Sequence, residues 1–309
     1  MLTKKENLEA IEKFSENLEI EGRSLWQDAR IRFMRNKAAM VSLFLLVLMT
    51  LAVIILPMIA PHTFDDTDWY AMHVAPNADH WFGTDSLGRD LYVRTLIGGR
   101  ISLMVGVMGA FVAVLIGTLY GAASGFIGGK VDRVMMRILE ILYAVPFMFL
   151  VIVLVTFFGR NIMLIFVAIG AIAWLDMARI VRGQTLSLRS KEFIEAAHVC
   201  GVSNWKIITR HIVPNVLGIV AVYSTLLIPS MILTESFLSF LGLGVQEPMT
   251  SWGALLQEGA QTMEVAIWQL AFPAVFMVVI LRIWLQASRA DFYNPFSQFI
   301  VIYTSTLLS

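Results

Sequence analysis

Ile101–Ile127 reads ISLMVGVMGAFVAVLIGTLYGAASGFI, a run of 27 residues without one charged side chain. A helix needs roughly 20 consecutive apolar residues to cross the hydrocarbon core of a bilayer, so this run is long enough to span a membrane. The whole chain has the same character, because 58% of its 309 residues are apolar and 15% are charged, against about a quarter in soluble domains. These features predict an all-α integral membrane protein.

Five further segments have the length and the lack of charge that membrane-spanning helices require. With the first run they give six predicted spans, which are Ala38–Ala60, Ile101–Ile127, Ile138–Phe158, Asn161–Ala178, Val216–Thr234 and Val265–Leu281. The third span contains Pro146, and the fourth follows it so closely that the two are expected to form a tight helical hairpin.

The basic residues predict the orientation of these spans, because loops rich in Lys and Arg stay in the cytoplasm. Basic residues gather before the first span, between the second and third, and most densely in the 179–213 loop. The 61–100 loop carries six Asp against three Arg, and the 237–264 loop carries three Glu and no basic residue, so both are expected outside. The alternation is free of conflict and predicts that both termini are cytoplasmic.

The chain is therefore expected to have three parts. These are a cytoplasmic N-terminal segment (1–37), a six-helix domain (38–281) that includes a cytoplasmic loop (179–214), and a tail (282–309). Residues 1–37 are too polar for a signal peptide, and the apolar run from Ala38 is too long for one, so it is expected to be a retained anchor. The amphipathic pattern of 21–37 predicts an interfacial helix, with a disordered tail as the alternative.

Composition argues against several classes of function. The 23 basic and 23 acidic residues give no net charge, which speaks against a nucleic-acid-binding protein. Cys200 is the one cysteine, so an intramolecular disulfide is excluded, and neither it nor any His has the spacing of a metal or catalytic site.

A membrane enzyme would need converging nucleophiles, bases or metal ligands, and the sequence offers none. A secondary transporter is expected to carry ionisable groups near the midplane, whereas Glu140 and Glu235 lie near span ends.

The chain is not expected to hydrolyse ATP or to hold a cofactor itself. A P-loop needs a glycine-rich turn whose N–H groups cradle phosphate, followed by a Lys and a hydroxyl group for magnesium. The nearest match, Ser124–Val131, lacks the first Gly and the hydroxyl residue, and it lies at the end of a span.

The 179–214 loop carries the most informative pattern. Good helix formers lead through Glu195, Ala196 and Ala197 to Gly201, which provides a helix stop, and a second short helix is expected before Pro214. Ser203 or Asn204 can cap that second helix. Two interpretations remain open on this pattern alone: a structured docking element, or an ordinary charged loop that only satisfies the orientation rule.

This pattern resembles the Glu-Ala-Ala loop, the EAA loop, of bacterial ABC importer permeases. Gly201 follows the second Ala by four residues and Pro214 follows the Gly by thirteen, as in that family, although His211 stands where the family usually has Ile. Other segments resemble the dipeptide/oligopeptide/nickel group of these permeases. They are FGTDSLGRD (82–90), GRISL (99–103), GGKVD (128–132), ARIVRGQ (178–184), SFLSFLGLG (236–244) and SWG (251–253). Within the group, the amino-acid sequence is most similar to the second membrane subunit of oligopeptide permeases, with dipeptide or nickel permeases as alternatives.

The resemblance implies a type I ABC importer permease fold in the bacterial inner membrane, and it implies partners. These are a homologous second permease, two ATPase subunits that bind ATP, an extracytoplasmic solute-binding protein and a peptide substrate. Glu195, Ala196, Ala197, Gly201 and Pro214 would belong to the loop that docks on the ATPase subunits and transmits their closure.

Four residues near the expected outer face have two interpretations each. Asp85, Arg89 and Asp90 could contact substrate or the binding protein, or could form a capped turn with ion pairs before the second span. Glu235 could line the pathway, or could reach the interface and pair there.

The tail departs from the family pattern. The resemblance is expected to end near Leu281, where an unrelated sequence follows, with a last apolar run at Phe299–Leu308. A frameshift in the last codons is the hypothesis, and a divergent tail is the alternative. Either would leave the sixth helix short, with Arg282 reaching for the inner interface.

Overall fold

The computed structural model describes residues 34–159 and 162–288, with residues 162–168 described by their backbone alone. The tail 289–309, with its frameshift hypothesis, and most of the interfacial helix predicted at 21–37 lie outside these ranges. In the described residues all regular structure is helical apart from one isolated bridge between Thr84 and Asp90, which confirms the predicted all-α class. The chain divides into two units, and the following description concerns Val41–Ser288.

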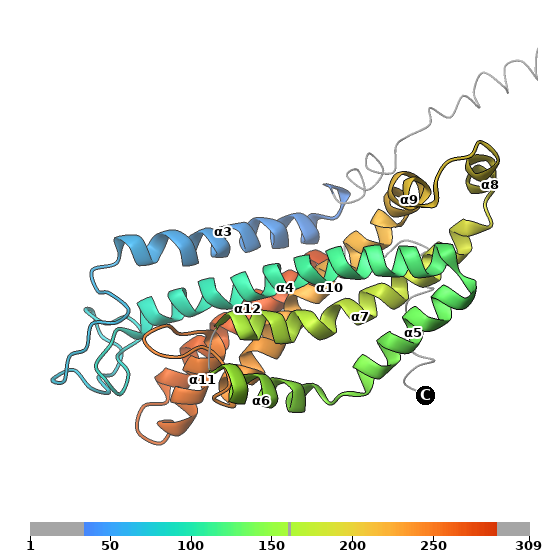
Figure 1. Cartoon of the computed structure of the whole chain (residues 1–309). Coiled ribbons are helices and arrows are strands. Elements are labelled where there is room, and N and C mark those ends of the chain that lie inside the picture. Colours follow the sequence, from blue (N-terminus) through green and yellow to red (C-terminus); the bar gives the residue numbers. More distant parts are fainter. Residues whose placement is uncertain (1–33, 160–161, 289–309) are drawn as a thin grey trace, which may run out of the picture. The chain divides into compact units, whose positions relative to one another are not determined.

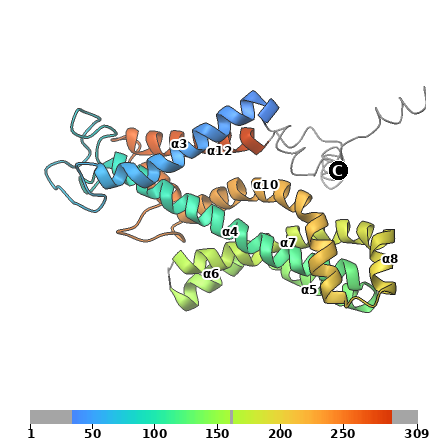
Figure 2. The same cartoon turned by 90° about the horizontal axis from the view of Figure 1, so that it is seen from above.

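Three long helices form the centre of this unit (Figures 1 and 2). They are α4 (Leu91–Ile127), α7 (Ile162–Arg189) and α10 (Val213–Phe240), and α4 packs along both of the others. Small residues along α4 let its backbone come close to its neighbours, as in many membrane helix pairs. At Gly121 a Cβ atom would lie 2.3 Å from the carbonyl oxygen of Ala178, so the contact of α4 with α7 at that point requires glycine.

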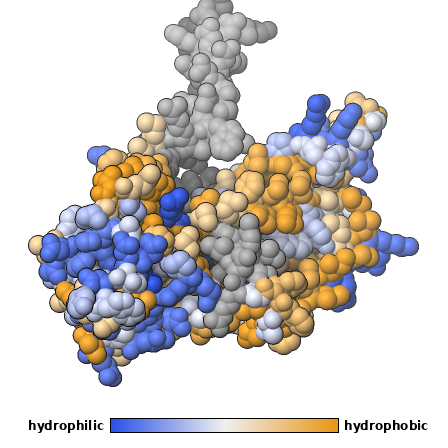
Figure 3. Space-filling model, turned by 60° about the vertical axis from the view of Figure 1, so that its left-hand side comes forward, coloured by the Kyte–Doolittle hydropathy of each residue, from blue (hydrophilic) through white to orange (hydrophobic). Residues whose placement is uncertain are grey.

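Two helices at the edge of the bundle enclose a second core. In α3 (Lys37–Ile59) Val53 is buried, and in α12 (Trp268–Ser288) Ile280 is buried, and both belong to a cluster around Trp252 of α11 (Trp252–Gln261). The opposite faces of these helices are apolar and exposed. On the face drawn in Figure 3, hydrophobic residues cover broad areas in the middle and hydrophilic residues gather toward the two ends, as expected of a protein whose sides contact lipid.

The third predicted span, 138–158, is wrong as one continuous helix. The structure has two helices there, α5 (Gly129–Ala144) and α6 (Phe147–Phe158), bent by 76° at the break. Pro146 explains the break, because proline has no N–H to continue the ladder and forces Val145 into the extended conformation observed, with φ −75° and ψ 121°.

Two other predicted boundaries shift outward. The fourth span was expected to end at Ala178, but α7 continues to Arg189. The sixth was expected to stop at Leu281, but α12 continues to Ser288, and the indole N–H of Trp284 donates to the carbonyl of Thr225, 2.8 Å away. The sixth helix is therefore not short within the described residues. Apolar runs mark the lipid-facing length of a helix, whereas helical hydrogen bonding continues past it.

Four helices of the described residues are long and apolar enough to cross a membrane: Lys37–Ile59, Leu91–Ile127, Asn204–Phe240 and Trp268–Ser288. The bent pair α5–α6 would be a fifth if it counts as one span. Several spans are therefore present, and the count of six stays a prediction.

Candidate functional site

The segment between α7 and α10 has the predicted helix–break–helix form. It contains α8 (Glu192–Val199), α9 (Asn204–Ile207) and a π-helical turn, η1 (Ile208–Ile212), which runs directly into α10. Figure 1 shows α8 and α9 at the end of the bundle where α7 ends and α10 begins. We refer to residues 190–213 as the linking segment.

The break follows from the conformation of Gly201. Its φ is +72°, and the N–H groups of Gly201 and Val202 donate to the carbonyls of His198 and Ala197 at 3.0 and 3.1 Å. This pattern is the Schellman motif, in which glycine ends a helix because other L-residues are strained at positive φ. A Cβ atom at Gly201 would meet nothing within 4 Å, so conformation, and not crowding, requires the glycine.

The linking segment has one buried and one exposed side. The buried side chains attach it to the bundle and are Ile194, Ala197, Ile207, Ile208 and Ile212. Glu195 and Ala196 are exposed, as are three large apolar residues, Phe193 at 42%, Val199 at 88% and Trp205 at 60%. Exposed apolar side chains beside a carboxylate on a short, firmly attached helix pair suit a protein partner.

The linking segment is tied to α4 by one ring contact and continues directly into α10. The ring of His198 stacks on Phe126, near the end of α4, with centroids 5.5 Å apart and planes 10° apart. Pro214 lies in the first turn of α10, where a missing N–H breaks no helical hydrogen bond. The linking segment is thus joined to α4 by a ring contact and to α10 by a continuous run of helix.

A charged group near the same end connects three helices. Asp132 in the first turn of α5 accepts two hydrogen bonds from Arg182 of α7, Nε to Oδ1 at 2.6 Å and Nη2 to Oδ2 at 2.6 Å. The hydroxyl of Ser124 on α4 also donates to Oδ1, at 2.5 Å. Two motifs from the sequence, GGKVD and ARIVRGQ, thus meet in one ion pair.

At the opposite end, Asp85 organises the loop before α4. Its Oδ1 accepts the backbone N–H groups of Leu87 and Arg89 at 2.8 and 2.9 Å, and its Oδ2 accepts Nε of Arg89 at 2.7 Å and Nη1 of Arg94. Asp90 caps α4 by accepting the N–H of Val93 at 2.9 Å. This geometry is that of the capped turn with ion pairs, one of the two interpretations of Asp85, Arg89 and Asp90.

The two arginines reach across to the segment between α10 and α12. Arg89 Nη2 lies 2.9 Å from Glu247 Oε1, and Arg94 forms a forked pair with Glu258 at 2.6 and 3.1 Å. Burial disfavours the charged form of Arg89, but the carboxylates of Asp85 and Glu247 favour it more strongly, so the pKa of Arg89 is raised above its usual value. The two arginines fasten residues 60–90 to residues 241–267, which together we call the loop cap.

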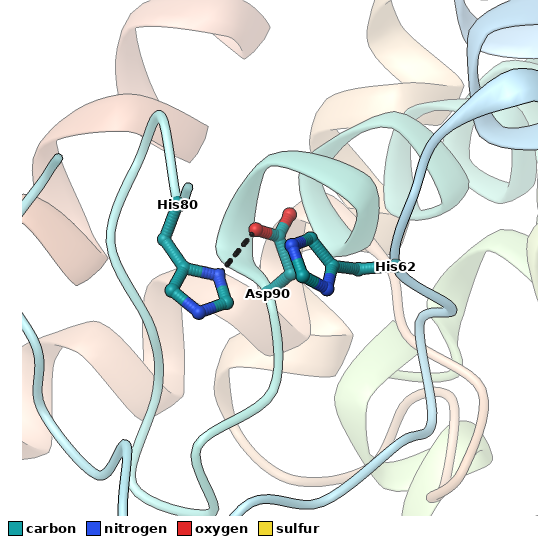
Figure 4. A group of neighbouring side chains, drawn as sticks. All are labelled: His62, His80 and Asp90. Atoms are coloured by element: carbon teal, nitrogen blue, oxygen red, sulfur yellow. Dashed lines mark hydrogen bonds and ion pairs between the residues drawn. The ribbon is translucent and has the colours of Figure 1, made fainter. Parts of the chain in front are cut away.

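One group in the loop cap has donor atoms suited to a metal ion. His62, His80 and Asp90 point toward one another (Figure 4), and one donor atom of each lies within 4.8 Å of the others. The imidazole rings of His62 and His80 stack with centroids 4.7 Å apart, and His80 Nδ1 lies 2.9 Å from Asp90 Oδ2. Zinc ligands sit about 2.0–2.1 Å from the ion, so these donors would have to move closer to bind one. This group was not predicted, because no metal-site spacing in the sequence connects its three members.

Glu235 is fully buried on α10. Its carboxylate accepts the hydroxyls of Ser102 on α4 at 2.8 Å and of Ser239 at 2.7 Å, and the hydroxyl of Ser102 in turn accepts the N–H of Trp252 at 3.2 Å. Glu235 therefore pairs inside the protein and joins α4, α10 and α11. Of its two interpretations, the pairing one fits these contacts, although the partners are serines and not interfacial charges.

Comparison with known proteins extends over most of the chain. The family model described as "Binding-protein-dependent transport system inner membrane component" matches residues 96–290, nine residues past Leu281, where the resemblance was expected to end. The model described as "N-terminal TM domain of oligopeptide transport permease C" matches residues 24–76.

Curated relatives cover nearly the full length. The oligopeptide transport system permease protein OppC of Escherichia coli (strain K12) is 68% identical over 283 residues, 91% of this chain and 94% of its own. The protein of the same name from Haemophilus influenzae is 63% identical over 268 residues, 86% of each chain. The dipeptide transport system permease protein DppC of Bacillus subtilis is 44% identical over 255 residues, 82% of this chain and 80% of its own.

Proposed function

Because the chain belongs to the family of inner-membrane components of binding-protein-dependent transport systems, we propose that it is a membrane subunit of an ATP-driven oligopeptide importer. Oligopeptides are favoured over dipeptides because the relatives with 68% and 63% identity carry the oligopeptide name, whereas the one named for dipeptides is 44% identical. Nickel, the third substrate of the group, has no support among these relatives.

We propose six spans with both termini in the cytoplasm. In this arrangement the loop cap, with its carboxylates, faces outward to receive a solute-binding protein, and the linking segment faces the cytoplasm. The support is the distribution of charge, since the linking segment and its flanks carry six basic residues and the 237–264 segment carries none. The chain pairs with a homologous second permease, and the peptide pathway runs between the two.

ATP is bound and hydrolysed by two partner subunits, which dock on the linking segment. The docking face is formed by Glu195, Ala196 and the exposed Val199 and Trp205. The conformation of the linking segment behind this face, and its entry into α10, depend on Ala197, Gly201 and Pro214. ATP favours the closed arrangement of its subunits, so its binding shifts the population of pathway conformations. This chain is expected to hold no cofactor of its own.

The observation that supports this proposal is that the linking segment has one buried side and one exposed, partly apolar side. Buried isoleucines fix it to the long helices, and its exposed side offers apolar surface that water alone would not favour. An ordinary charged loop would need neither feature.

Cys200 provides a direct test, because it is the one cysteine of the chain and lies exposed in the linking segment. In membranes that contain the complete transporter, a membrane-impermeant maleimide is expected to label Cys200 in inside-out vesicles and not in right-side-out ones. Removing the ATPase subunits should speed the labelling at least about threefold, because docking covers the segment.

The matched control is a Cys200→Ser, Tyr70→Cys variant, which moves the one thiol to a fully exposed position in the loop cap. It should be labelled in right-side-out vesicles. Labelling of Cys200 from the outside would overturn the orientation, and equal rates with and without the ATPase subunits would overturn the docking role.

A further inference from the structure

Three helices bring a polar group together on a part of the bundle that is otherwise apolar. Asp176 and Arg179 lie on α7, Tyr143 on α5 and Tyr223 on α10. The hydroxyl of Tyr143 donates to Asp176 Oδ1 at 3.3 Å, and the guanidinium carbon of Arg179 lies 4.3 Å from the centre of the same ring. Tyr223 is close enough to interact electrostatically with Asp176 and Tyr143. We call these four residues the α7 polar group.

The two charges of this group are only partly satisfied. In the part of the chain that the structure describes, Asp176 has one hydrogen bond, from Tyr143, and no cation within 4.0 Å, while Arg179 has no carboxylate within that distance. Asp176 and Arg179 are three residues apart and so share one face of the helix, yet they do not pair with each other. A carboxylate can accept about four hydrogen bonds and a guanidinium can donate five, so both retain unused capacity.

The position of the group makes this unused capacity costly. Asp176 lies two residues before the predicted end of the fourth span and Arg179 directly after that end, but α7 continues ten residues beyond Arg179 to Arg189, about 15 Å along the helix. Neither charge is therefore at a helix end. Ionisable residues within spanning helices almost always face a water-filled cavity or a partner, since hydrocarbon would penalise them by several kcal/mol.

The exposure of the group indicates where that cavity must be. Asp176 is half-buried and Tyr143 and Arg179 are exposed, so the group opens to the outside of this chain and not into its own core. Lipid on this face would leave the Asp176 carboxylate in hydrocarbon. The face therefore requires water or a protein partner, and the pathway between two permease subunits would provide the water.

We propose that the α7 polar group binds the amino-terminal end of a peptide during its passage, an assignment that rests on the proposed function. The Asp176 carboxylate accepts the peptide's terminal ammonium group, and the Arg179 guanidinium donates to the nearest backbone carbonyl oxygen. Tyr143 holds both side chains in place through its hydroxyl and its ring. The ammonium and the first carbonyl lie within a few ångströms of each other in every peptide, which matches two side chains one helical turn apart. Such a site recognises the peptide backbone and accepts any side chains.

The test uses the complete transporter in proteoliposomes, with its ATPase subunits and binding protein, and a radiolabelled tripeptide with a free amino terminus. Asp176→Asn removes the charge and keeps the shape, and is expected to lower uptake at least about tenfold. Asp176→Glu keeps the charge and should restore uptake to within about twofold. Glu140→Gln is the matched control, because it removes an exposed carboxylate of α5 that pairs with Arg137 outside the group. It should import like the wild type.

A second measurement locates the peptide. A photoreactive benzoylphenylalanine in place of Tyr143 should capture the labelled peptide during ATP turnover, and unlabelled peptide should suppress that capture. Import by Asp176→Asn at the wild-type rate would overturn the assignment while leaving the proposed function intact. Capture of the second permease and not of peptide, with loss of assembly in Asp176→Asn, would also overturn it by making the group a subunit interface. A wild-type complex that imports no peptide would overturn the proposed function, and the assignment with it.

Discussion

Arg182 of α7 holds Asp132 of α5 in a two-armed ion pair, with 2.6 Å between Nε and Oδ1 and 2.6 Å between Nη2 and Oδ2. The hydroxyl of Ser124 completes the group from α4. The carboxylate thus ties three helices together near the linking segment, the proposed docking site of the ATPase subunits. A planar guanidinium suits this role because both arms are fixed at once.

Arg182→Lys should destabilise the protein by about 1–2 kcal/mol, because an ammonium group makes one contact where the guanidinium makes two. The measurement is thermal unfolding of the purified transporter in detergent, where a drop of a few degrees is expected. Arg137→Gln is the control, since its pair with Glu140 is exposed on both sides and should contribute less than about 1 kcal/mol. Equal effects of the two substitutions would show that the Asp132–Arg182 pair contributes no more to stability than the exposed Arg137–Glu140 pair.

Gly201→Ala should weaken the coupling of ATP hydrolysis to transport. A non-glycine residue at a φ of +72° costs about 1–2 kcal/mol, which would shift the break between α8 and α9 away from its observed form. Gly201→Asn should be milder, because Asn tolerates this conformation better. The readout is the number of peptides imported per ATP hydrolysed.

Gly218→Ala is the control for this prediction. Gly218 lies inside α10 without positive φ, and a Cβ atom there would meet nothing within 4 Å. Alanine favours a helix interior by about 1 kcal/mol over glycine, so this variant should be neutral or more stable. If Gly201→Ala kept wild-type coupling, the positive-φ break between α8 and α9 would not contribute to the coupling of ATP hydrolysis to transport.

These features differ in how far the sequence could predict them. The break at Gly201 is local, since the residue that ends α8 also signals it, and it was predicted correctly. The bend at Pro146 was visible as a proline in an apolar run, but the apolar run dominated the prediction of one span. Arg89 and Glu247 are 158 residues apart and Arg94 and Glu258 are 164 apart, so their pairing follows from helix packing that no local pattern encodes. The contact of Tyr143 with Asp176 was missed for the same reason, whereas Asp176 itself was visible as an ionisable residue in the fourth predicted span.

Arg94→Met should destabilise the loop cap by about 3 kcal/mol, because it leaves the buried Asp85 with one cation fewer and Glu258 without its forked partner. Limited proteolysis should then cut residues 60–90 faster than in the wild type. Cleavage at the wild-type rate would mean that Arg89 alone fastens the loop cap.

Glu235→Leu should destabilise the protein by about 1–3 kcal/mol, because the hydroxyls of Ser102 and Ser239 would lose a buried acceptor. Glu235→Gln should cost less, since the amide oxygen can still accept one hydroxyl and the amide nitrogen can donate to the other.

Combining Glu235→Leu with Ser239→Ala tests whether the lost hydrogen bond causes the destabilisation. Ser239 donates to Glu235 at 2.7 Å, so removing both partners should cost less than the sum of the two single changes, by about 1 kcal/mol in thermal unfolding. Additive losses would mean that the hydroxyl finds another acceptor and that Glu235 acts through its packing alone.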